Sequence, residues 1–215
     1  LALGTGNAVA GMVGAGRPVD DLRRYLSGGV LAARRLDLVT VEGRRTPFAG
    51  VGVDAAILED YEWLRRRLGP RGRRLAGGLW GYGLAIALRS APRQVFQRRP
   101  AYCEIANAGG PAWRLGPSGE LVGRPIEHGE LLHAGPCMLA AGSTVPFFGF
   151  RLRAFPYAGR RPGAMHLRVA TRIPVPALIV NAPRIFSGDF SHPGIVDVQA
   201  TAVTMTFDRP DPFQA

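Results

Sequence analysis

The sequence predicts a mainly β protein of the α+β class. A C-terminal antiparallel β-sandwich with a helical insertion follows the last helices of an α/β domain. Three observations predict this fold. After residue 92, short apolar segments alternate with Gly and Pro at the spacing of antiparallel strands. One long helical segment, over about 54–91, interrupts the β pattern. Near the start of the chain, in contrast, short helical segments follow an apolar and glycine-rich stretch.

Two short helices are expected first, over residues 5–13 and 18–27. Pro18 suits the first turn of the second helix, where its missing N–H has no partner to lose. The acidic pair that follows Pro18 suits the positive end of the helix dipole in the same turn. We therefore assign residues 1–28 to the end of an α/β domain.

A β-hairpin opens the second unit, which we expect to span residues 29–215. Residues 36–41 have strand character, Glu42-Gly43-Arg44 has the composition of a tight turn, and residues 46–53 return. The helical insertion over about 54–91 comes next. Further strands are expected over 94–98, 101–107, 131–141, 148–153, 165–171, 175–180 and 195–207.

Composition narrows the class of partner. The chain has 215 residues, of which 47% are apolar and 20% charged, so it can bury a sizeable core. All 27 basic residues are Arg, and the net charge is +11. This balance favours anionic partners such as phosphates or acidic lipid surfaces. Nucleic acid is not an expected partner, because no motif that interleaves aromatic and basic residues is present. No apolar run is long enough to span a membrane.

The sequence predicts no metal site built from Cys and His. Cys103 and Cys137 are far apart and match no ligand spacing, so we expect buried thiols of a cytosolic protein. Asp189, Ser191 and His192 are close in sequence, but without a nucleophile-elbow pattern we expect them to serve a turn. The four histidines are scattered without ligand spacing: His128, His133, His166 and His192.

A glycine-rich turn near the start of the chain is a candidate phosphate site. An apolar strand end runs into the turn, and the turn runs into a helix whose free N–H groups attract anions. The glycines let a phosphate or another backbone approach closely. The alternative is an ordinary strand-to-helix turn capped by a side-chain oxygen. The residues of this turn are Gly4, Thr5, Gly6 and Asn7.

Asp54 is the candidate catalytic residue. It follows the glycine-rich strand end Gly50-Val51-Gly52 and opens the helical insertion. One interpretation is a simple helix N-cap, worth about 1 kcal/mol. The other is a carboxylate at a domain cleft that faces a substrate hydroxyl.

An arginine cluster within the insertion is the third candidate. Six Arg within ten residues cannot all point one way on a helix, so most of them face solvent. One or two are candidates to clamp nucleotide phosphates, because the guanidinium fork matches phosphate geometry. The others are candidates to rest on an acidic membrane surface. The cluster comprises Arg65, Arg66, Arg67, Arg71, Arg73 and Arg74.

Taken in order, these segments resemble the diacylglycerol kinase catalytic family, which includes sphingosine and ceramide kinases. Residues 4–10 look like the Gly-Thr-x-Asn turn of the family, and residues 35–41 look like its Arg-x-Asp-Leu-x-x-Val strand. Residues 50–55 look like its Gly-x-Gly-x-Asp-Ala segment. His192-Pro193 and the strand that follows look like its closing region.

The resemblance implies a phosphofructokinase-like ATP domain followed by a β-sandwich. It also implies phosphoryl transfer from ATP, with Mg²⁺, to a lipid hydroxyl, a reaction that depends on positioning and charge neutralisation. Thr5 and Asn7 would line the nucleotide pocket. Asp54 would lie near the lipid head group, and Arg67 and Arg73 would meet phosphate.

Two family motifs differ here. The Gly-Gly-Asp-Gly-Thr motif does not occur in the chain, and an Asp-Asp-Gly-Leu segment that helps to organise Mg²⁺ is replaced by Arg161-Pro162-Gly163-Ala164. That replacement offers no carboxylate oxygen to a hard cation. We therefore expect the chain to be the later part of a larger protein and not to catalyse the reaction alone.

The leading hypothesis is a bacterial ATP-dependent lipid kinase that acts on a diacylglycerol-like or sphingosine-like lipid. It would be cytoplasmic and peripherally bound to an anionic membrane, with its oligomeric state open. One alternative is a non-catalytic lipid-binding or regulatory sandwich. A lesser alternative is an enzyme similar to NAD kinase, which shares the two-lobe plan. The apolar segment over 145–150 and the basic insertion favour a lipid over a dinucleotide.

Overall fold

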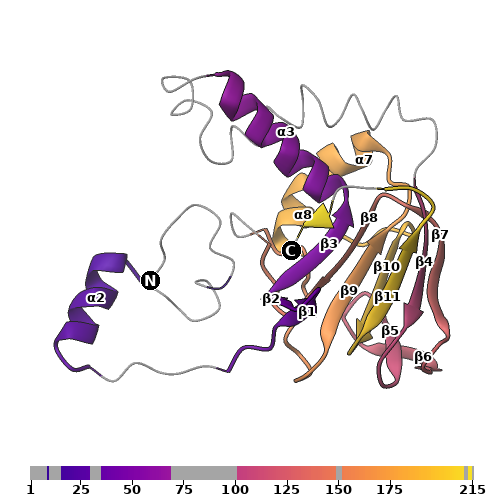
Figure 1. Cartoon of the computed structure of the whole chain (residues 1–215), viewed down its shortest axis with the longest axis horizontal. Helices are drawn as coiled ribbons and strands as arrows, with labels where there is room; N and C mark the ends of the chain where they lie inside the picture. Colours follow the sequence, from indigo (N-terminus) through magenta and orange to yellow (C-terminus); the bar gives the residue numbers. More distant parts are fainter. Residues whose placement is uncertain are drawn as a thin grey trace.

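The computed structural model describes Val9 and residues 16–29, 35–68, 101–148, 152–210 and 213–214. Figure 1 shows a β-sandwich with α3, α7 and α8 at one end and the β5–β6 hairpin at the other. The described elements are α2 (Pro18–Leu26), β1 (Val39–Val41), β2 (Arg44–Thr46), β3 (Phe48–Gly52), α3 (Val53–Arg67), β4 (Ala101–Asn107), β5 (Ala112–Leu115), β6 (Leu121–Ile126), β7 (Leu131–Cys137), β8 (Leu139–Ser143), β9 (Met165–Ala170), α7 (Val175–Val180), α8 (Ala182–Ser187), β10 (Ile195–Ala200), β11 (Val203–Phe207) and β12 (Phe213–Gln214).

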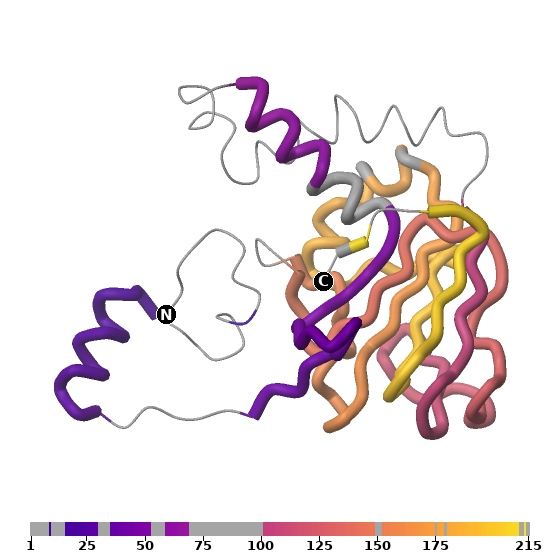
Figure 2. The backbone as a smooth tube through the Cα atoms, in the orientation of Figure 1, coloured from indigo at the N-terminus to yellow at the C-terminus, as the bar shows by residue number. Residues whose placement is uncertain are grey.

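Two sheets form the sandwich, as the strand-rich pattern predicts. The larger has seven strands in the order β12-β3-β8-β9-β10-β5-β6, and the smaller has the order β11-β4-β7. The short hairpin β1–β2 leads into the edge of the larger sheet (Figure 2). Every described strand pairing is antiparallel. The predicted fold class is therefore confirmed.

The main core lies between the two sheets. Strand β4 alternates buried and less buried residues, so that Cys103 and Ile105 point inward. They pack against Leu132 of β7 and Leu167 of β9 in one cluster. Cys103 and Cys137 are both buried thiols, as predicted.

The predicted hairpin turn is confirmed, but the strand predicted over 46–53 does not pair with β1. Residues Arg44–Thr46 (β2) pair with β1 instead, and Phe48–Gly52 (β3) pairs with β8 in the larger sheet. Glu42 and Gly43 form the turn between β1 and β2 with positive φ angles of 49° and 77°. Two successive positive φ angles are the signature of the tight turn whose twist matches that of the flanking strands. Val41 pairs with Arg44 across this turn.

Two of the predicted strands are pairs of strands in the structure. Residues 131–141 divide at Met138, where β7 of the smaller sheet gives way to β8 of the larger one. Residues 195–207 divide in the same way at Thr201, between β10 and β11. Apolar residues continue through both corners, so the sequence pattern does not mark where the chain changes sheets.

The prediction of a strand over 175–180 is wrong, because these residues form helix α7. Their β-branched residues favour a strand, but Pro174 and Pro176 suit a helix start, and the Leu178 N–H donates to the Pro174 carbonyl at 3.2 Å. A strand was also predicted over 148–153. The residues of this range that the structure describes, Phe148 and 152–153, are not in a strand, although the Phe148 N–H donates to the Leu152 carbonyl at 2.8 Å.

The edge hairpin formed by β5 and β6 was not predicted. Its exposed outer strand is rich in Gly, Pro and Arg, and therefore lacks a strand-like pattern. The predicted helix over 18–27 is confirmed as α2, and the insertion begins as α3. The rest of the insertion, the helix over 5–13 apart from Val9, and the strand over 94–98 lie outside the described residues.

Candidate functional site

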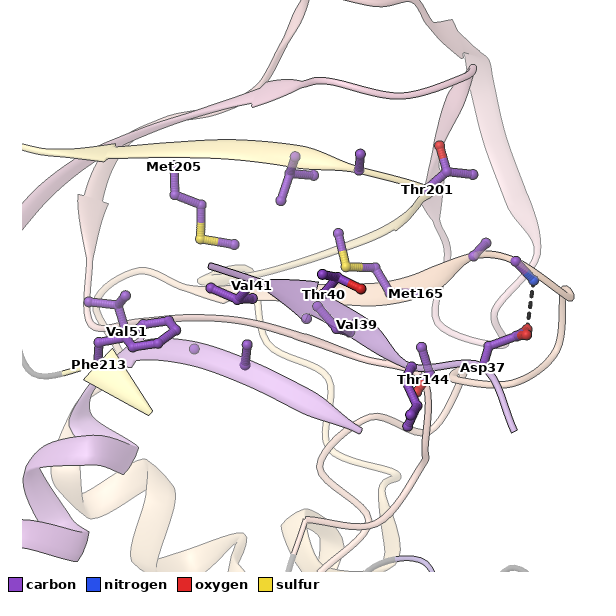
Figure 3. Close-up of a pocket in the computed structure, with 18 of the residues that line it drawn as sticks. Asp37, Val39, Thr40, Val41, Val51, Thr144, Met165, Thr201, Met205 and Phe213 are labelled. Atoms are coloured by element: carbon purple, nitrogen blue, oxygen red, sulfur yellow. Dashed lines mark hydrogen bonds between the residues drawn. The ribbon is translucent and has the colours of Figure 1, made fainter. Parts of the chain in front are cut away.

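A cavity of about 680 Å³ lies between the β1–β3 region and strand β11 of the smaller sheet. Figure 3 shows its side chains converging from both sheets. Val51, Met205 and Phe213 line one end, while Asp37 and Thr144 lie toward the other. The lining is therefore apolar along most of its length and polar at one end.

A small residue helps to keep this space open. Strand β8 faces the cavity with Gly142, where most strands would carry a larger side chain. A Cβ atom added to Gly142 would lie 2.7 Å from the sulfur of Met165, which also lines the cavity. The glycine therefore leaves room beside Met165.

Asp37 forms the polar end of the cavity. Its Oδ2 accepts a hydrogen bond from the Gly163 N–H at 2.7 Å. Gly163 belongs to the turn where the resemblance implies carboxylates and where this sequence has Pro-Gly. A carboxylate from far away in the chain therefore reaches this turn. The sequence analysis placed Asp37 in a family-like strand but gave it no role.

The described residues do not fit a magnesium site by themselves. Within residues 16–29, 35–68, 101–148, 152–210 and 213–214, no three Asp, Glu, His or Cys side chains cluster as metal ligands. Mg²⁺ in kinase sites is usually held by one or two carboxylates together with waters and substrate phosphates, and Asp37 is the one carboxylate among the described residues that line this cavity. The predicted nucleotide turn, Gly4, Thr5, Gly6 and Asn7, lies outside the described residues, and so does Arg73.

The segment with Asp54 forms a sharp strand-to-helix junction. Strand β3 ends at Gly52, which has φ 118° and is the N-cap of α3. A Cβ atom at Gly52 would clash with the Met138 carbonyl oxygen, so only glycine fits. Asp54 is the second residue of α3 and does not occupy the N-cap position that the simpler interpretation assigned to it.

Arg67 ends helix α3 with its side chain exposed. Its guanidinium carbon lies 5.4 Å from the centre of the Trp63 ring, within the range of a cation–π contact. The neighbouring Arg66 pairs instead with Glu62 at 3.0 Å. These arginines therefore point in different directions, as the crowding of the cluster predicts.

A buried polar cluster lies on the other face of the larger sheet. Strand β9 directs Met165 toward the cavity, and by alternation His166 and Arg168 point the opposite way. Arg168 donates to both carboxylate oxygens of Asp197 on β10, and His166 Nε2 lies 2.9 Å from Asp197 Oδ1. Sequence analysis missed this cluster, because its members are about 30 residues apart.

The cluster shifts the pKa values of its members. Burial alone would raise the pKa of Asp197, but hydrogen bonds from His166 and Arg168 outweigh burial and lower that pKa to about 2. Burial lowers the pKa of His166 below its ordinary value of 6.5, and the bond to Asp197 offsets this only in part. Asp197 is therefore ionised and His166 neutral near pH 7.

The segment around His192 has the turn role that was predicted. The Gly194 N–H donates to His192 Nδ1 at 2.9 Å, and the Asp189 N–H donates to the Arg184 carbonyl at 2.9 Å. These bonds close the loop between α8 and β10.

Comparison with known proteins shows the fold. No family profile matches the sequence, and neither does any curated protein. Two solved structures, each of a proposed diacylglycerol kinase from Bacillus anthracis strain Sterne, are similar to this chain. The first has a TM-score of 0.56 and a sequence identity of 14%, and the match covers 96% of this chain and 57% of the other protein. The second has a TM-score of 0.56 and a sequence identity of 12%, and the match covers 98% of this chain and 58% of the other protein.

The chain thus has the fold of a large part of these two proteins and spans less than two thirds of their length. At this identity, the similarity is one of fold. Among the described helices, none has both the length and the apolar character needed to cross a bilayer.

Proposed function

We propose that this chain is the substrate-binding part of an ATP-dependent lipid kinase that phosphorylates a hydroxyl group of a diacylglycerol-like or sphingosine-like lipid. The observation that carries the proposal is the largely apolar cavity inside a sandwich whose fold is similar to two proposed diacylglycerol kinases. Its volume of about 680 Å³ falls within the usual range for small-molecule sites.

The lining of the cavity suits an amphipathic substrate. Hydrocarbon leaves water when it contacts side chains such as Val51, Met205 and Phe213, which favours binding of an acyl chain. The polar end with Asp37 and Thr144 offers hydrogen-bonding partners for the head group. We infer that the substrate binds with its chain between the sheets.

The remaining assignments follow from the resemblance. We propose that Asp54 lies at the cleft, near the lipid head group and facing its reacting hydroxyl. Thr5 and Asn7 would contact the nucleotide, and Arg67 and Arg73 would neutralise phosphate charge. ATP with a divalent cation is proposed for the whole protein, with cation ligands beyond those described here.

A second candidate is a lipid-binding sandwich without catalysis. The observation in its favour is that the described residues hold no cluster of carboxylates for a metal ion. Both candidates bind lipid in the cavity, so only phosphoryl transfer distinguishes them.

The test is a transfer assay with the full-length protein. Radiolabelled ATP and Mg²⁺ are incubated with diacylglycerol, sphingosine, ceramide or monoacylglycerol in mixed micelles, and the lipid fraction is analysed for label. We expect label in at least one lipid. If no lipid is labelled while fluorescent lipid still binds, the kinase proposal is wrong and the lipid-binding alternative holds.

A further inference from the structure

The helices α7 and α8 carry apolar residues on their outer side as well as on their inner side. Their inner side packs on the larger sheet, where Leu178 and Ile185 contact the cluster of Ala170, Ile173 and Phe190. A helix that covers a sheet in this way normally shows polar residues on its outer side. Here the exposed residues include large apolar ones beside the polar Arg184 and Ser187.

Large apolar side chains remain exposed on the outer side. Val180, the last residue of α7, is 79% exposed, and Phe186 in α8 is 39% exposed. Three prolines of the same segment are also exposed: Pro174, Pro176 and Pro183. Contact with an apolar phase would bury these side chains, and this burial would stabilise the contact.

The charged residues within the α7–α8 segment are both positive. From residue 172 to 188 the sequence contains no Asp or Glu, and its charged residues are Arg172 and Arg184, both exposed. The first acidic residue beyond this stretch is Asp189. Helix α3, which Figure 1 places at the same end of the sandwich, carries exposed Trp63 and exposed side chains of both charges, Arg67 and Glu62 among them.

We propose that the outer side of α7 and α8 is the surface by which this protein docks on an anionic lipid bilayer. Val180 and Phe186 enter the acyl boundary, and Arg172 and Arg184 meet the lipid phosphates. Exposed apolar residues together with Arg, and with no Asp or Glu from residue 172 to 188, match the composition of helices that lie in a membrane interface. The inference deepens the proposed function, because a lipid kinase has to reach its substrate at a membrane.

Vesicle binding tests the surface directly. Full-length protein is sedimented with vesicles of phosphatidylglycerol and phosphatidylcholine in equal parts, and with vesicles of phosphatidylcholine alone. We expect binding to the anionic vesicles, and much weaker binding to the neutral ones. The double substitution Val180→Asp and Phe186→Asp should lower the partition coefficient by about tenfold or more, since it places two carboxylates against an anionic interface.

A matched control is available at the other end of the molecule. Leu121 and Val122 on β6 are 52% and 46% exposed, and Figure 1 shows β6 far from α7. The pair Leu121→Asp and Val122→Asp should therefore leave vesicle binding unchanged. Thermal melting of both double variants verifies that they are folded.

Activity on two forms of one substrate separates this proposal from the kinase proposal. The Val180→Asp, Phe186→Asp variant should keep transfer to a short-chain, water-soluble diacylglycerol and lose transfer to the same head group in vesicles. If no form is phosphorylated by the wild type but anionic vesicles still bind through α7 and α8, the docking proposal stands and the kinase proposal falls.

Three results would overturn the docking proposal. In the first, the wild-type protein does not bind anionic vesicles or binds neutral ones equally well. In the second, the α7–α8 variant binds as well as the β6 variant. In the third, the α7–α8 variant changes the oligomeric state in light scattering without changing vesicle binding, which would assign this surface to a second copy of the chain.

Discussion

Arg168 on β9 and Asp197 on β10 face each other across two neighbouring strands, with two hydrogen bonds of 2.7 and 3.0 Å between them. The guanidinium group also donates to the Ala154 carbonyl at 2.7 Å. The side chains of the pair are 11% and 14% exposed. This contact therefore fastens the loop around Ala154 to the sheet, on the face opposite the cavity.

Arg168→Met should destabilise the protein strongly, because it leaves the buried Asp197 carboxylate without its main partner. We expect a loss of about 3 kcal/mol in the free energy of unfolding, measured by urea denaturation. The control is Glu62→Gln, which removes an exposed ion pair with Arg66 and should leave the midpoint unchanged. Equal midpoints for both variants would show that the buried pair adds nothing.

Acid should destabilise the protein in two stages. The folded pKa of His166 is below 6.5, so the unfolded chain takes up this proton first and stability falls as the pH drops below that value. The folded pKa of Asp197 is about 2 against an ordinary 3.8, so stability falls again between these values.

Urea unfolding at a series of pH values measures this dependence. Asp197→Asn should remove the lower stage, since the amide does not titrate. A wild-type protein that becomes more stable on acidification just below pH 6.5 would contradict the His166 assignment, and one that becomes more stable between pH 3.8 and about 2 would contradict the Asp197 assignment.

Gly52→Ala should unfold the junction between β3 and α3. The new Cβ atom would meet the Met138 carbonyl in a backbone conformation with φ 118°. We expect a cost of about 3 kcal/mol or more, from the clash and the strain together. Gly43→Ala is the control: it has φ 77° with nothing within 4 Å of the added atom, so its cost should be about 1 kcal/mol.

Local patterns predicted those parts of the fold that local physics determines. The β1–β2 hairpin depends on two turn residues, and the sandwich as a whole on repeated short strands. Helix α7 and the corners at Met138 and Thr201 depend instead on packing between distant segments. At both corners the apolar pattern continues while the chain changes sheets, so periodicity carries no signal there.

The candidate site also has one part that a local pattern predicts, the Asp54 segment, and one part that depends on distant segments, the cavity with Asp37. Asp54 stands in a recognisable glycine-rich segment, and its place at the start of α3 was predicted. The Asp37–Gly163 contact joins residues 126 positions apart, and no local pattern announces it. The cavity likewise needs β1, β3, β8 and β11 together, which only the folded chain supplies.

A bulky side chain in the cavity should impair use of long-chain lipids. Val41 lines the cavity from the hairpin and is half-buried, so Val41→Trp fills space without cutting into the main core. We expect kcat/KM for a long-chain substrate to fall by about tenfold, and for a short-chain one by much less.

Thr204→Trp on β11 is the control for this prediction. Thr204 is exposed and lies between Val203 and Met205, which both line the cavity, so it points away from that space. If both tryptophan variants lost kcat/KM equally, the acyl chain would not bind in this cavity.

Asp54→Asn should lower lipid phosphorylation by the full-length protein by about 100-fold or more, because it removes the carboxylate charge that we place against the substrate hydroxyl. The change preserves size, so the melting temperature and ATP binding should stay close to those of the wild type. Glu59→Gln is the matched control: Glu59 is exposed in the same helix, and its loss should leave turnover unchanged. If both variants turn over lipid at the wild-type rate, Asp54 acts only through the helix dipole, a contribution of about 0.5 kcal/mol to stability.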